Sequence, residues 1–490
     1  RLARVSMGSP SHQIPPSPPA TPPHTPASAS TIGMDPAAVS RRTFYSTHFS
    51  DVVQERIVIA MVGLPARGKS YMSKAIVRYC NFLGVSCRLF NAGNTRRSRG
   101  GAGADASFFD PENASSRALK EQIAMETLEQ LLEWLCNSTG LSCGIFDATN
   151  TTRARREALL ERCRRAPQPV SVIFLETVCN DEAILQQNYQ LKMRNEDYEG
   201  KDEEQALLDF IQRVKAYEKV YEPITDEEAE ATAYPPMRYI RVVDAGKKLV
   251  VFQLDGDSIV CKWIVQLMNA IHLAPRKLTI ALAGESLNDV SGIRGGDSAL
   301  SEEGYRYATA VTELVKQRID TGRPPPLVLA GTLQRYEQMA DMLRPIAANV
   351  LPFRPLNELC FGLLEGLRAG LLCHSFPAEH AAREADKLNY RYPGVGGQSY
   401  FDLIMQMQSI LMTIEASRRD IIIICDAAVS RVLLGYFEAT PIKNIPEVPV
   451  APGIVEFTRS HSGFVRNDVG VETGRSSMLT MVGVGQASPA

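Results

Sequence analysis

The chain has 490 residues, of which 44% are hydrophobic and 22% charged, so we expect mostly globular units of about 100–200 residues each. Its 53 Lys and Arg and 55 Asp and Glu residues give a net charge of −2, so no overall field attracts nucleic acid or an anionic membrane. No uncharged apolar run approaches the roughly 18 residues of a membrane-spanning helix. The ten cysteines are scattered without a C-x-x-C pair, which predicts reduced thiols and a cytoplasmic protein.

The chain begins with a segment rich in Pro, Ser, Thr and Ala, from Ser6 to Ala29. Such a segment cannot bury enough apolar surface to offset its ordering entropy, so we predict that residues 1–50 are disordered. Its Ser/Thr-Pro steps leave two alternatives, an inert tail or a tail that protein kinases phosphorylate to regulate the protein. These steps begin at Ser9, Ser17, Thr21 and Thr25. The first residue is Arg1 rather than Met, which is compatible with a longer parent protein.

Apolar runs typical of strands then alternate with helical patterns. In the first half, the expected strands are 56–64, 86–93, 142–150, 170–177 and 237–243. Between them, the stretch 115–135 has apolar residues three and four apart, as an amphipathic helix does. This alternation favours an α/β fold with a mostly parallel, doubly wound sheet.

After Pro275 the α/β pattern starts again. The new apolar runs are RKLTIALAGES (276–286), PPLVLAGTLQR (325–335) and SRRDIIIICDAAVSR (417–431). We therefore expect one α/β domain over residues 51–275 and a second over residues 276–458. Residues 459–490 are rich in Gly and Ser without strong periodicity, and we predict a flexible tail there.

The sharpest motif is Gly63–Ser70, GLPARGKS, a complete G-x-x-x-x-G-K-[ST] sequence. It follows the apolar run 56–62 and precedes a helical stretch from Tyr71 to Tyr79. Its glycines let backbone N–H groups point at phosphates, at a helix N-terminus whose dipole favours anions. Lys69 would then reach the β- and γ-phosphates of ATP, and the Ser70 hydroxyl would ligate Mg²⁺. The alternative is a Gly-rich turn that binds nothing.

A P-loop usually has an acidic residue at the end of a neighbouring strand, where it holds the metal. Asp147 ends the run CGIFD and is our candidate, although such an Asp is also common as a helix cap or turn residue. Arginines follow two of the expected strands, within residues 94–99 and 149–156. Ligands of α/β folds bind just beyond the strand ends, and arginine is suited to clamp phosphate. The residues alone therefore predict a P-loop kinase with an anionic small-molecule acceptor.

Five motifs together carry a family resemblance: GLPARGKSY (63–71), FNAG-x-x-RR (90–97), DATNTTRARR (147–156), ETVCND (176–181) and LMNAIH (267–272). Through them the chain resembles the 6-phosphofructo-2-kinase/fructose-2,6-bisphosphatase family from about residue 54 to residue 458. The resemblance implies transfer of the γ-phosphoryl group of ATP to the C2 hydroxyl of fructose 6-phosphate. The product would be fructose 2,6-bisphosphate, a regulator of glycolysis. The resemblance also implies a homodimer.

The resemblance further implies roles for individual residues. Nucleotide would bind Gly63, Leu64, Pro65, Ala66, Arg67, Gly68, Lys69, Ser70, Tyr71, Asn188 and Lys192. Fructose 6-phosphate would bind Arg96, Lys120, Thr149, Arg155, Lys192, Arg213 and Tyr217. The catalytic positions would be Lys69, Asp147, Cys179 and Lys192, with Ser70 and Asp147 holding Mg²⁺. Lys120 stands where the family has an arginine, so it keeps the charge but loses the bidentate fork. Phosphoryl transfer needs no thiol, so on general grounds Cys179 is a packing residue.

The second domain resembles the histidine-phosphatase half of this family through residues 295–308, 356–359, 390–400 and 427–437. Both catalytic histidines are missing. Leu282 and Ala283 stand where that half has Arg-His, and Asp426 stands at the second histidine position. Ala283 cannot form a phospho-enzyme and Leu282 cannot neutralise a phosphate. Asp426 would add a like charge near Glu358, which costs about 4 kcal/mol at about 4 Å and an effective dielectric near 20. We therefore expect no hydrolysis of the 2-phosphate.

Other anion-binding positions of that half remain, namely Arg335, Arg383, Lys387, Tyr400 and Arg431. They persist either for folding or solubility, or as a low-affinity sugar-phosphate site that regulates the kinase. The sequence as a whole predicts an ATP- and Mg²⁺-dependent 6-phosphofructo-2-kinase whose bisphosphatase activity is lost. The alternatives are a bifunctional enzyme with unusual phosphatase residues, and a non-catalytic regulator that binds nucleotide and sugar phosphate.

Overall fold

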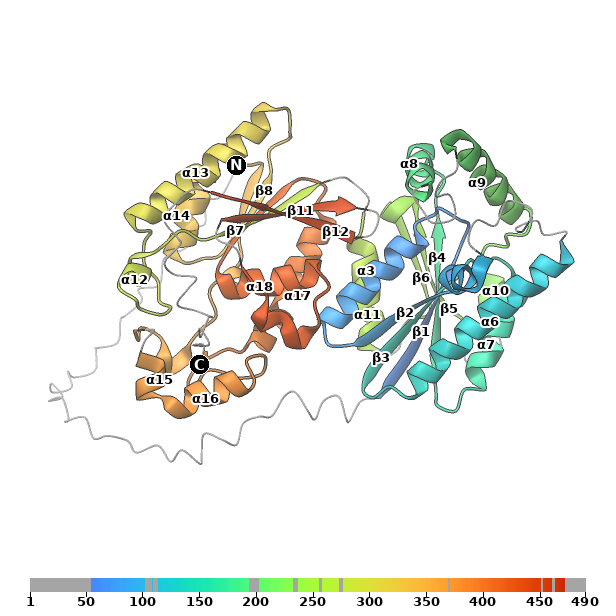
Figure 1. The fold of residues 1–490 in the computed structure, drawn as a ribbon, viewed down its shortest axis with the longest axis horizontal. Coiled ribbons are helices and arrows are strands. Elements are labelled where there is room, and N and C mark those ends of the chain that lie inside the picture. Colours follow the sequence, from blue (N-terminus) through green and yellow to red (C-terminus); the bar gives the residue numbers. More distant parts are fainter. Residues whose placement is uncertain are drawn as a thin grey trace, which may run out of the picture. The chain divides into compact units, whose positions relative to one another are not determined.

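The protein folds around two six-stranded sheets, each accompanied by helices (Figure 1). The computed structural model describes residues 54–101, 108, 113–193, 202–231, 237–254, 258–272, 276–368, 371–450, 453–460 and 463–471. The predicted N-terminal tail and the last residues of the predicted C-terminal tail lie outside these ranges. No helix in the described ranges is both long enough and apolar enough to cross a bilayer.

The first sheet has the strand order β2-β3-β1-β4-β5-β6. Its strands are β1 (Glu55–Val62), β2 (Ser86–Asn91), β3 (Leu141–Asp147), β4 (Ser171–Val178), β5 (Arg238–Val243) and β6 (Lys248–Phe252). The first five run parallel, and β6 pairs antiparallel with β5. The side chains from Ile57 to Val62 are apolar and fully buried, as expected for a central strand covered on both faces. The predicted α/β class, with a mostly parallel doubly wound sheet, is confirmed.

Helices connect these strands, and several begin at a capping side chain. Among the described residues they are α3 (Lys69–Phe82), α4 (Ala92–Arg96), α6 (Ala114–Cys136), α7 (Arg153–Arg164), α8 (Glu182–Lys192), α9 (Glu203–Glu218), α10 (Asp226–Ala231) and α11 (Ile259–Ala270), with a π-helical turn η1 (Arg97–Gly101) and a 3-10 turn η2 (Asp244–Gly246). Asn113, Thr152 and Asp181 accept hydrogen bonds from first-turn N–H groups of α6, α7 and α8. The predicted helix 115–135 lies within α6.

The second sheet has the order β12-β11-β7-β10-β8-β9. Its strands are β7 (Lys277–Leu282), β8 (Leu327–Ala330), β9 (Asn349–Pro352), β10 (Ile421–Cys425), β11 (Ile454–Ser460) and β12 (Gly463–Val469). Its described helices are α12 (Leu287–Val290), α13 (Glu302–Asp320), α14 (Gln334–Leu343), α15 (Leu372–Ser375), α16 (Pro377–Ala385), α17 (Tyr400–Ala416) and α18 (Ala427–Phe437), with 3-10 turns η3 (Arg354–Leu356), η4 (Gly362–Leu364) and η6 (Ile442–Glu447). Strands β7, β8, β9 and β10 are parallel, and β11 is antiparallel to both β7 and β12.

The prediction of a flexible tail from residue 459 is wrong over its first part, because β12 adds an edge strand to the second sheet. Phe464 of this strand packs its ring against those of Phe437 and Phe457, with centroids 4.9 and 6.5 Å away. The pairing with β11 and this aromatic contact order the segment. Both are contacts with other elements, so the local sequence pattern does not indicate them.

A buried ionic cluster bonds α3 to helices of the second sheet. The Glu415 carboxylate on α17 accepts hydrogen bonds from Arg78 of α3 and Tyr436 of α18, each 3.0 Å long. Arg276, just before β7, donates to the other carboxylate oxygen at 3.1 Å. All four side chains are buried, so the helix that follows the P-loop is anchored in the second half of the chain.

Candidate active site

The loop Gly63–Ser70 joins β1 to α3, as the sequence predicts. Gly63 and Gly68 have φ angles of 132° and 94°, a region that glycine adopts without strain. A Cβ atom at Gly63 would lie 2.5 Å from the Thr177 carbonyl oxygen, so the position has no space for a side chain. The first N–H groups of a helix lack intrahelical acceptors, so the start of the 14-residue α3 offers donors to an anion.

Lys69 places a buried ammonium group inside this loop. Its Nζ donates to the carbonyl oxygens of Gly63 and Leu64, at 2.8 and 2.6 Å. Burial lowers the pKa of Lys69 to about 7, against the opposing influence of the Asp147 carboxylate, and Lys192 adds to the lowering. Arg67 and Arg213 lower this pKa further, so they too lie within electrostatic reach. Arg67 is also paired with Glu218 at 3.5 Å. Basic groups gathered at a P-loop in this way suit a polyphosphate.

Asp147 ends β3 and is buried. One of its carboxylate oxygens accepts a hydrogen bond of 2.5 Å from the Asn91 side-chain amide, which the sequence analysis did not single out. Beyond Asp147, the Thr149 carbonyl oxygen accepts a bond of 3.0 Å from the Gly63 N–H. Asn150 donates to the Met61 carbonyl oxygen at 2.8 Å. These bonds fix the strand end that carries Asp147 and Thr149 against the P-loop.

Helix α8 also contacts the P-loop. The Asn188 amide donates to the Ala66 carbonyl oxygen at 2.9 Å, and Arg67 donates to the Tyr189 hydroxyl at 3.3 Å. Lys192 lies at the C-terminal end of the same helix. Burial lowers the pKa of Lys192 as well, against the influence of Asp147. The predicted nucleotide residues of α8 thus lie beside the predicted loop.

Cys179 directly follows β4, and its thiol is buried. Its sulfur donates to the Asp181 carbonyl oxygen at 3.8 Å. Burial raises the pKa of Cys179, so the side chain is a thiol rather than a thiolate at neutral pH. This environment fits a packing role and offers no activated nucleophile.

Three predicted acceptor residues form one cluster with the Phe108 ring, two of them directly at that ring. The Arg96 guanidinium and the Lys120 ammonium each lie 5.9 Å from the centre of the Phe108 ring. Lys120 also lies 5.9 Å from the centre of the Tyr217 ring. Arg96, Lys120 and Tyr217 come from α4, α6 and α9, so three separate helices contribute to one basic and aromatic cluster. Phe108 is a contact that the sequence analysis did not assign.

The two neighbouring arginines of α7 have different surroundings. Arg155 is half-buried and donates to Glu121 of α6 at 2.7 Å, next to the predicted acceptor residue Lys120. Arg156 is fully buried, donates to both oxygens of Glu228 at 2.8 and 2.6 Å, and also bonds the Glu222 carbonyl oxygen at 2.9 Å. Arg156 therefore has a structural role, and Arg155 is the one that borders the site.

Comparison with known proteins gives the site a family. Residues 45–275 match the family described as 6-phosphofructo-2-kinase, and residues 283–466 match the histidine phosphatase superfamily, branch 1. A 6-phosphofructo-2-kinase/fructose-2,6-bisphosphatase of Caenorhabditis elegans is 35% identical over 409 residues, which cover 82% of this chain and 86% of that protein. The chain belongs to the 6-phosphofructo-2-kinase/fructose-2,6-bisphosphatase family. The resemblance inferred from the motifs is thus confirmed.

Relatives named for the kinase alone are equally similar. The 6-phosphofructo-2-kinase 1 of Saccharomyces cerevisiae is 36% identical over 404 residues, which cover 78% of this chain and 48% of that protein. A probable 6-phosphofructo-2-kinase of Schizosaccharomyces pombe is 33% identical over 440 residues, which cover 78% of this chain and 65% of that protein. The chain therefore spans between about half and two thirds of the length of these two relatives.

The predicted degenerate phosphatase site lies where β7 and β10 end side by side. Leu282 pairs with Cys425, the Ala283 N–H donates to the Cys425 carbonyl oxygen at 2.9 Å, and Asp426 follows directly. Leu282 and Ala283 are buried and apolar, so the strand end that faces Asp426 carries neither a cation nor a nucleophile.

Near this strand end lies the buried Arg335 guanidinium, which pairs with three carboxyl groups. It pairs with Asp426, donates to Glu358 at 2.7 Å, and lies 3.5 Å from Asp289. The Tyr336 hydroxyl donates to the same Asp426 oxygen at 2.5 Å. Burial, with Asp426 nearby, raises the pKa of Glu358 to about 8, so the Glu358 carboxyl is mostly protonated at neutral pH. The two carboxyl groups that we expected to repel each other do share the site, but the Arg335 cation and the proton on Glu358 relieve the repulsion.

The remaining basic positions of the second half contact protein groups. Arg431 donates to the Tyr400 hydroxyl at 3.3 Å, and Arg383 donates to the Tyr392 hydroxyl at 3.1 Å. Lys387 pairs with Glu447 at 2.9 Å and with Glu384 at 3.3 Å. Burial lowers the pKa of Arg383, but Tyr392, Glu384 and Tyr400 raise it and prevail. Arg383, Tyr400 and Arg431 therefore share one region. These contacts favour the alternative in which these basic residues persist for folding rather than for binding a sugar phosphate.

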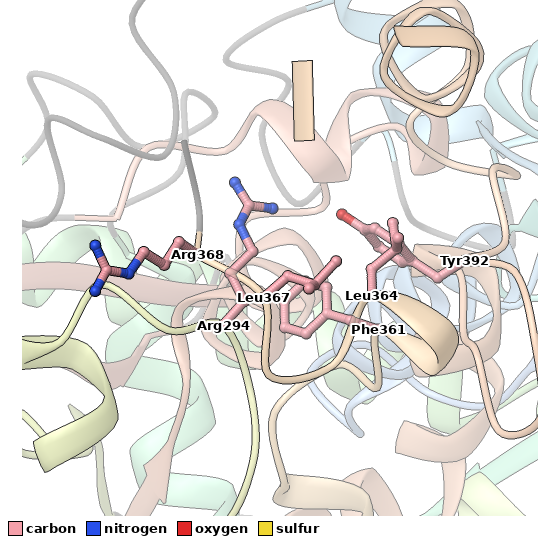
Figure 2. A pocket seen from close by; sticks show the side chains of 6 residues that line it. All are labelled: Arg294, Phe361, Leu364, Leu367, Arg368 and Tyr392. Atoms are coloured by element: carbon pink, nitrogen blue, oxygen red, sulfur yellow. The ribbon is translucent and has the colours of Figure 1, made fainter. Parts of the chain in front are cut away.

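Two hollows in the surface do not coincide with the predicted site. One is a cavity of about 10 Å³ among Phe361, Leu364, Tyr392 and their neighbours, with the Arg368 guanidinium pointing away from the rings (Figure 2). It has room for about one water molecule. The other, of about 440 Å³, is bordered by Arg241 and residues 223–226 and includes none of the predicted site residues. The candidate site therefore rests on its side chains and P-loop geometry.

Proposed function

We propose that the protein is a 6-phosphofructo-2-kinase, which transfers the γ-phosphoryl group of ATP to the C2 hydroxyl of fructose 6-phosphate. The observation that carries this proposal is the buried Lys69 in a P-loop, within electrostatic reach of Asp147, Lys192 and Arg213. Family membership supplies the substrates, because curated relatives bear this enzyme name.

In this proposal, the protein contributes position and charge, on which phosphoryl transfer chiefly depends. Lys69, Lys192 and the N-terminus of α3 hold the phosphates and stabilise the negative charge that develops on them. Arg67 and Asn188 connect the loop to α8 and keep it in shape. The thiol of Cys179 takes no covalent part.

Magnesium fits this site because Ser70 and Asp147 supply a hydroxyl and a carboxylate oxygen, the ligand types that it prefers. No group of three or more His, Cys, Asp or Glu side chains suited to a metal occurs in the described ranges. That agrees with Mg²⁺, which uses one or two carboxylates together with substrate phosphates and water. Bound there, it would neutralise charge on the β- and γ-phosphates.

The acceptor would be held by the cluster of Arg96, Lys120 and Tyr217, with Arg155 and Thr149 at its border. Two cations at the Phe108 ring suit the 6-phosphate of the sugar. Because Lys120 is a point charge without the planar fork of an arginine, it holds the phosphate with less directional control.

We further propose that the second half hydrolyses no fructose 2,6-bisphosphate. Ala283 offers no nucleophile, Leu282 offers no charge, and Asp426 already engages the Arg335 guanidinium and the Tyr336 hydroxyl. The homodimer and the cytoplasmic location complete the proposal, and they rest on the family resemblance and on cysteine usage.

The test is incubation of the purified full chain with Mg-ATP and fructose 6-phosphate, with detection of an acid-labile bisphosphate. We expect product from the wild type and a loss of at least about a hundredfold in Lys69→Ala, in line with the removal of a charge that stabilises the transition state. The exposed Lys262→Ala on α11 is the matched control and should keep full activity. Binding of both substrates without turnover would establish the non-catalytic regulator instead.

A further inference from the structure

Asn91 links the two halves of the proposed kinase site. It is the last residue of β2, and its register partner in the parallel neighbour is Asp147, the last residue of β3. Residues in register on parallel strands project to the same face, so the two side chains meet beyond the sheet edge. There the Asn91 amide nitrogen donates to the Asp147 carboxylate at 2.5 Å.

The amide oxygen of Asn91 has a second, separate partner. It accepts a hydrogen bond of 3.0 Å from the Asn94 N–H and so caps the N-terminus of α4. A backbone N–H can only donate, so the side-chain atom facing it is the oxygen, and the nitrogen must face Asp147. The chemistry of both partners therefore fixes the orientation of the amide group.

The segment that Asn91 caps carries Arg96, the buried arginine of the acceptor cluster. Its start is held further by the Thr95 hydroxyl, which donates to the Asn91 carbonyl oxygen at 3.3 Å. The Thr127 hydroxyl of α6, which donates to the Ile123 carbonyl oxygen at 2.7 Å, lies 3.1 Å from the Thr95 hydroxyl. One asparagine thus restrains the rotation of the Asp147 carboxylate and fixes the start of the helix that carries Arg96.

We propose that Asn91 is a positioning residue of the kinase reaction, which holds the metal-binding carboxylate and the acceptor-binding α4 in a fixed relation. The inference rests on the proposed function, because it takes Asp147 and Arg96 in the roles assigned there. It goes beyond that function by naming a side chain that acts through Asp147 and through α4 and so couples the two subsites.

Two substitutions distinguish the effect of the Asn91 bond to Asp147 from the effect of its bond to the Asn94 N–H. Asn91→Ser keeps a good helix cap but is too short to reach Asp147, whereas Asn91→Ala loses both bonds. We expect Asn91→Ser to lower kcat at least tenfold while the KM for fructose 6-phosphate changes less than threefold. Asn91→Ala should lower kcat similarly and also raise that KM at least fivefold.

A binding measurement gives a readout that does not depend on turnover. In calorimetry with a non-hydrolysable ATP analogue, Mg²⁺ should increase the affinity of the wild type, and Asn91→Ser should reduce that increase at least tenfold. The matched control is Asn81→Ser. Asn81 lies on α3, and the change removes its two side-chain bonds to the backbone of Cys87 in β2, which are 3.0 and 2.9 Å long. It should lower the melting temperature without changing kcat or the Mg²⁺ effect.

An Asn91→Ser protein with wild-type kcat and a wild-type Mg²⁺ effect would overturn the inference. So would equal changes in Asn91→Ser and Asn81→Ser, because they would assign Asn91 a purely structural role. An inactive wild type with an intact Mg²⁺ effect would instead overturn the proposed function, so the two failures are distinguishable.

Discussion

At the scale of single residues, Lys69 is a cation whose charge depends on its ligand. Its ammonium group is withdrawn from water and bonded to the carbonyl oxygens of Gly63 and Leu64, and burial lowers its pKa to about 7. A bound phosphate stabilises the charged form and so raises this pKa. Nucleotide binding above neutral pH therefore requires Lys69 to take up a proton.

Calorimetry in buffers with different ionisation enthalpies measures this uptake. About one pH unit above the Lys69 pKa, we expect the wild type to take up close to one proton on binding the Mg²⁺ complex of a non-hydrolysable ATP analogue. One unit below that pKa, the uptake should be small. Lys69→Met should remove the difference between the two conditions, and equal proton uptake by wild type and variant would contradict this account.

Glu358 predicts a pH dependence of stability. Burial, with Asp426 nearby, raises its pKa from 4.5 to about 8, so between these values the native state binds a proton that the unfolded state releases. The free energy of unfolding should therefore fall as the pH rises from about 4.5 to about 8. Urea denaturation at three pH values in this range tests it. Glu358→Gln should flatten the slope, and the exposed Glu313→Gln should not.

Local sequence shows some residues of the site and hides others. Lys69 and Asp147 could be proposed from sequence because each belongs to a local pattern. Lys69 lies in a short loop motif, and Asp147 ends an apolar run. Asn91 and Phe108 were not, since their importance comes from contacts with Asp147 and Lys120 on other elements. The different roles of Arg155 and Arg156 are likewise hidden in the sequence, because Arg156 binds Glu228, 72 residues further along the chain.

At the scale of elements, α3 depends on Glu415 of α17. This carboxylate is almost fully buried and receives bonds from Arg78 and Arg276. Glu415→Gln would leave two buried guanidinium groups without their counter-charge, so we expect a loss of about 3–5 kcal/mol in the free energy of unfolding. Glu161→Gln removes a partner of two exposed or half-exposed arginines and should cost less than about 1 kcal/mol. Equal urea midpoints for the two variants would contradict this.

The strands also show where prediction from sequence ends. The central strands, such as β1 and β10, are continuous apolar runs because both faces are buried, and the sequence indicates them directly. Edge strand β12 has only half-buried and exposed side chains, without a strict alternation. It is ordered by pairing with β11 and by the packing of Phe464, which are contacts between elements rather than a local pattern.

At the scale of the whole molecule, two mostly parallel sheets present two strand-end sites with different surroundings. Beyond β1 and β3, Lys69 and Lys192 lie within electrostatic reach of the Asp147 carboxylate, and these basic groups suit an anion. Beyond β10, the carboxylates of Asp426 and its neighbours already surround Arg335. The contrast leads to the central claim that phosphoryl groups enter fructose 6-phosphate at the first site and are not removed at the second.

The most direct test of this claim is one closed time course. The full chain is given fructose 6-phosphate in excess and a limited amount of Mg-ATP, and fructose 2,6-bisphosphate and inorganic phosphate are followed together. We predict that the bisphosphate rises until ATP is consumed and then stays constant, with no inorganic phosphate released. A bisphosphate level that peaks and declines, with a matching release of phosphate, would contradict the account and show that the second site hydrolyses the product.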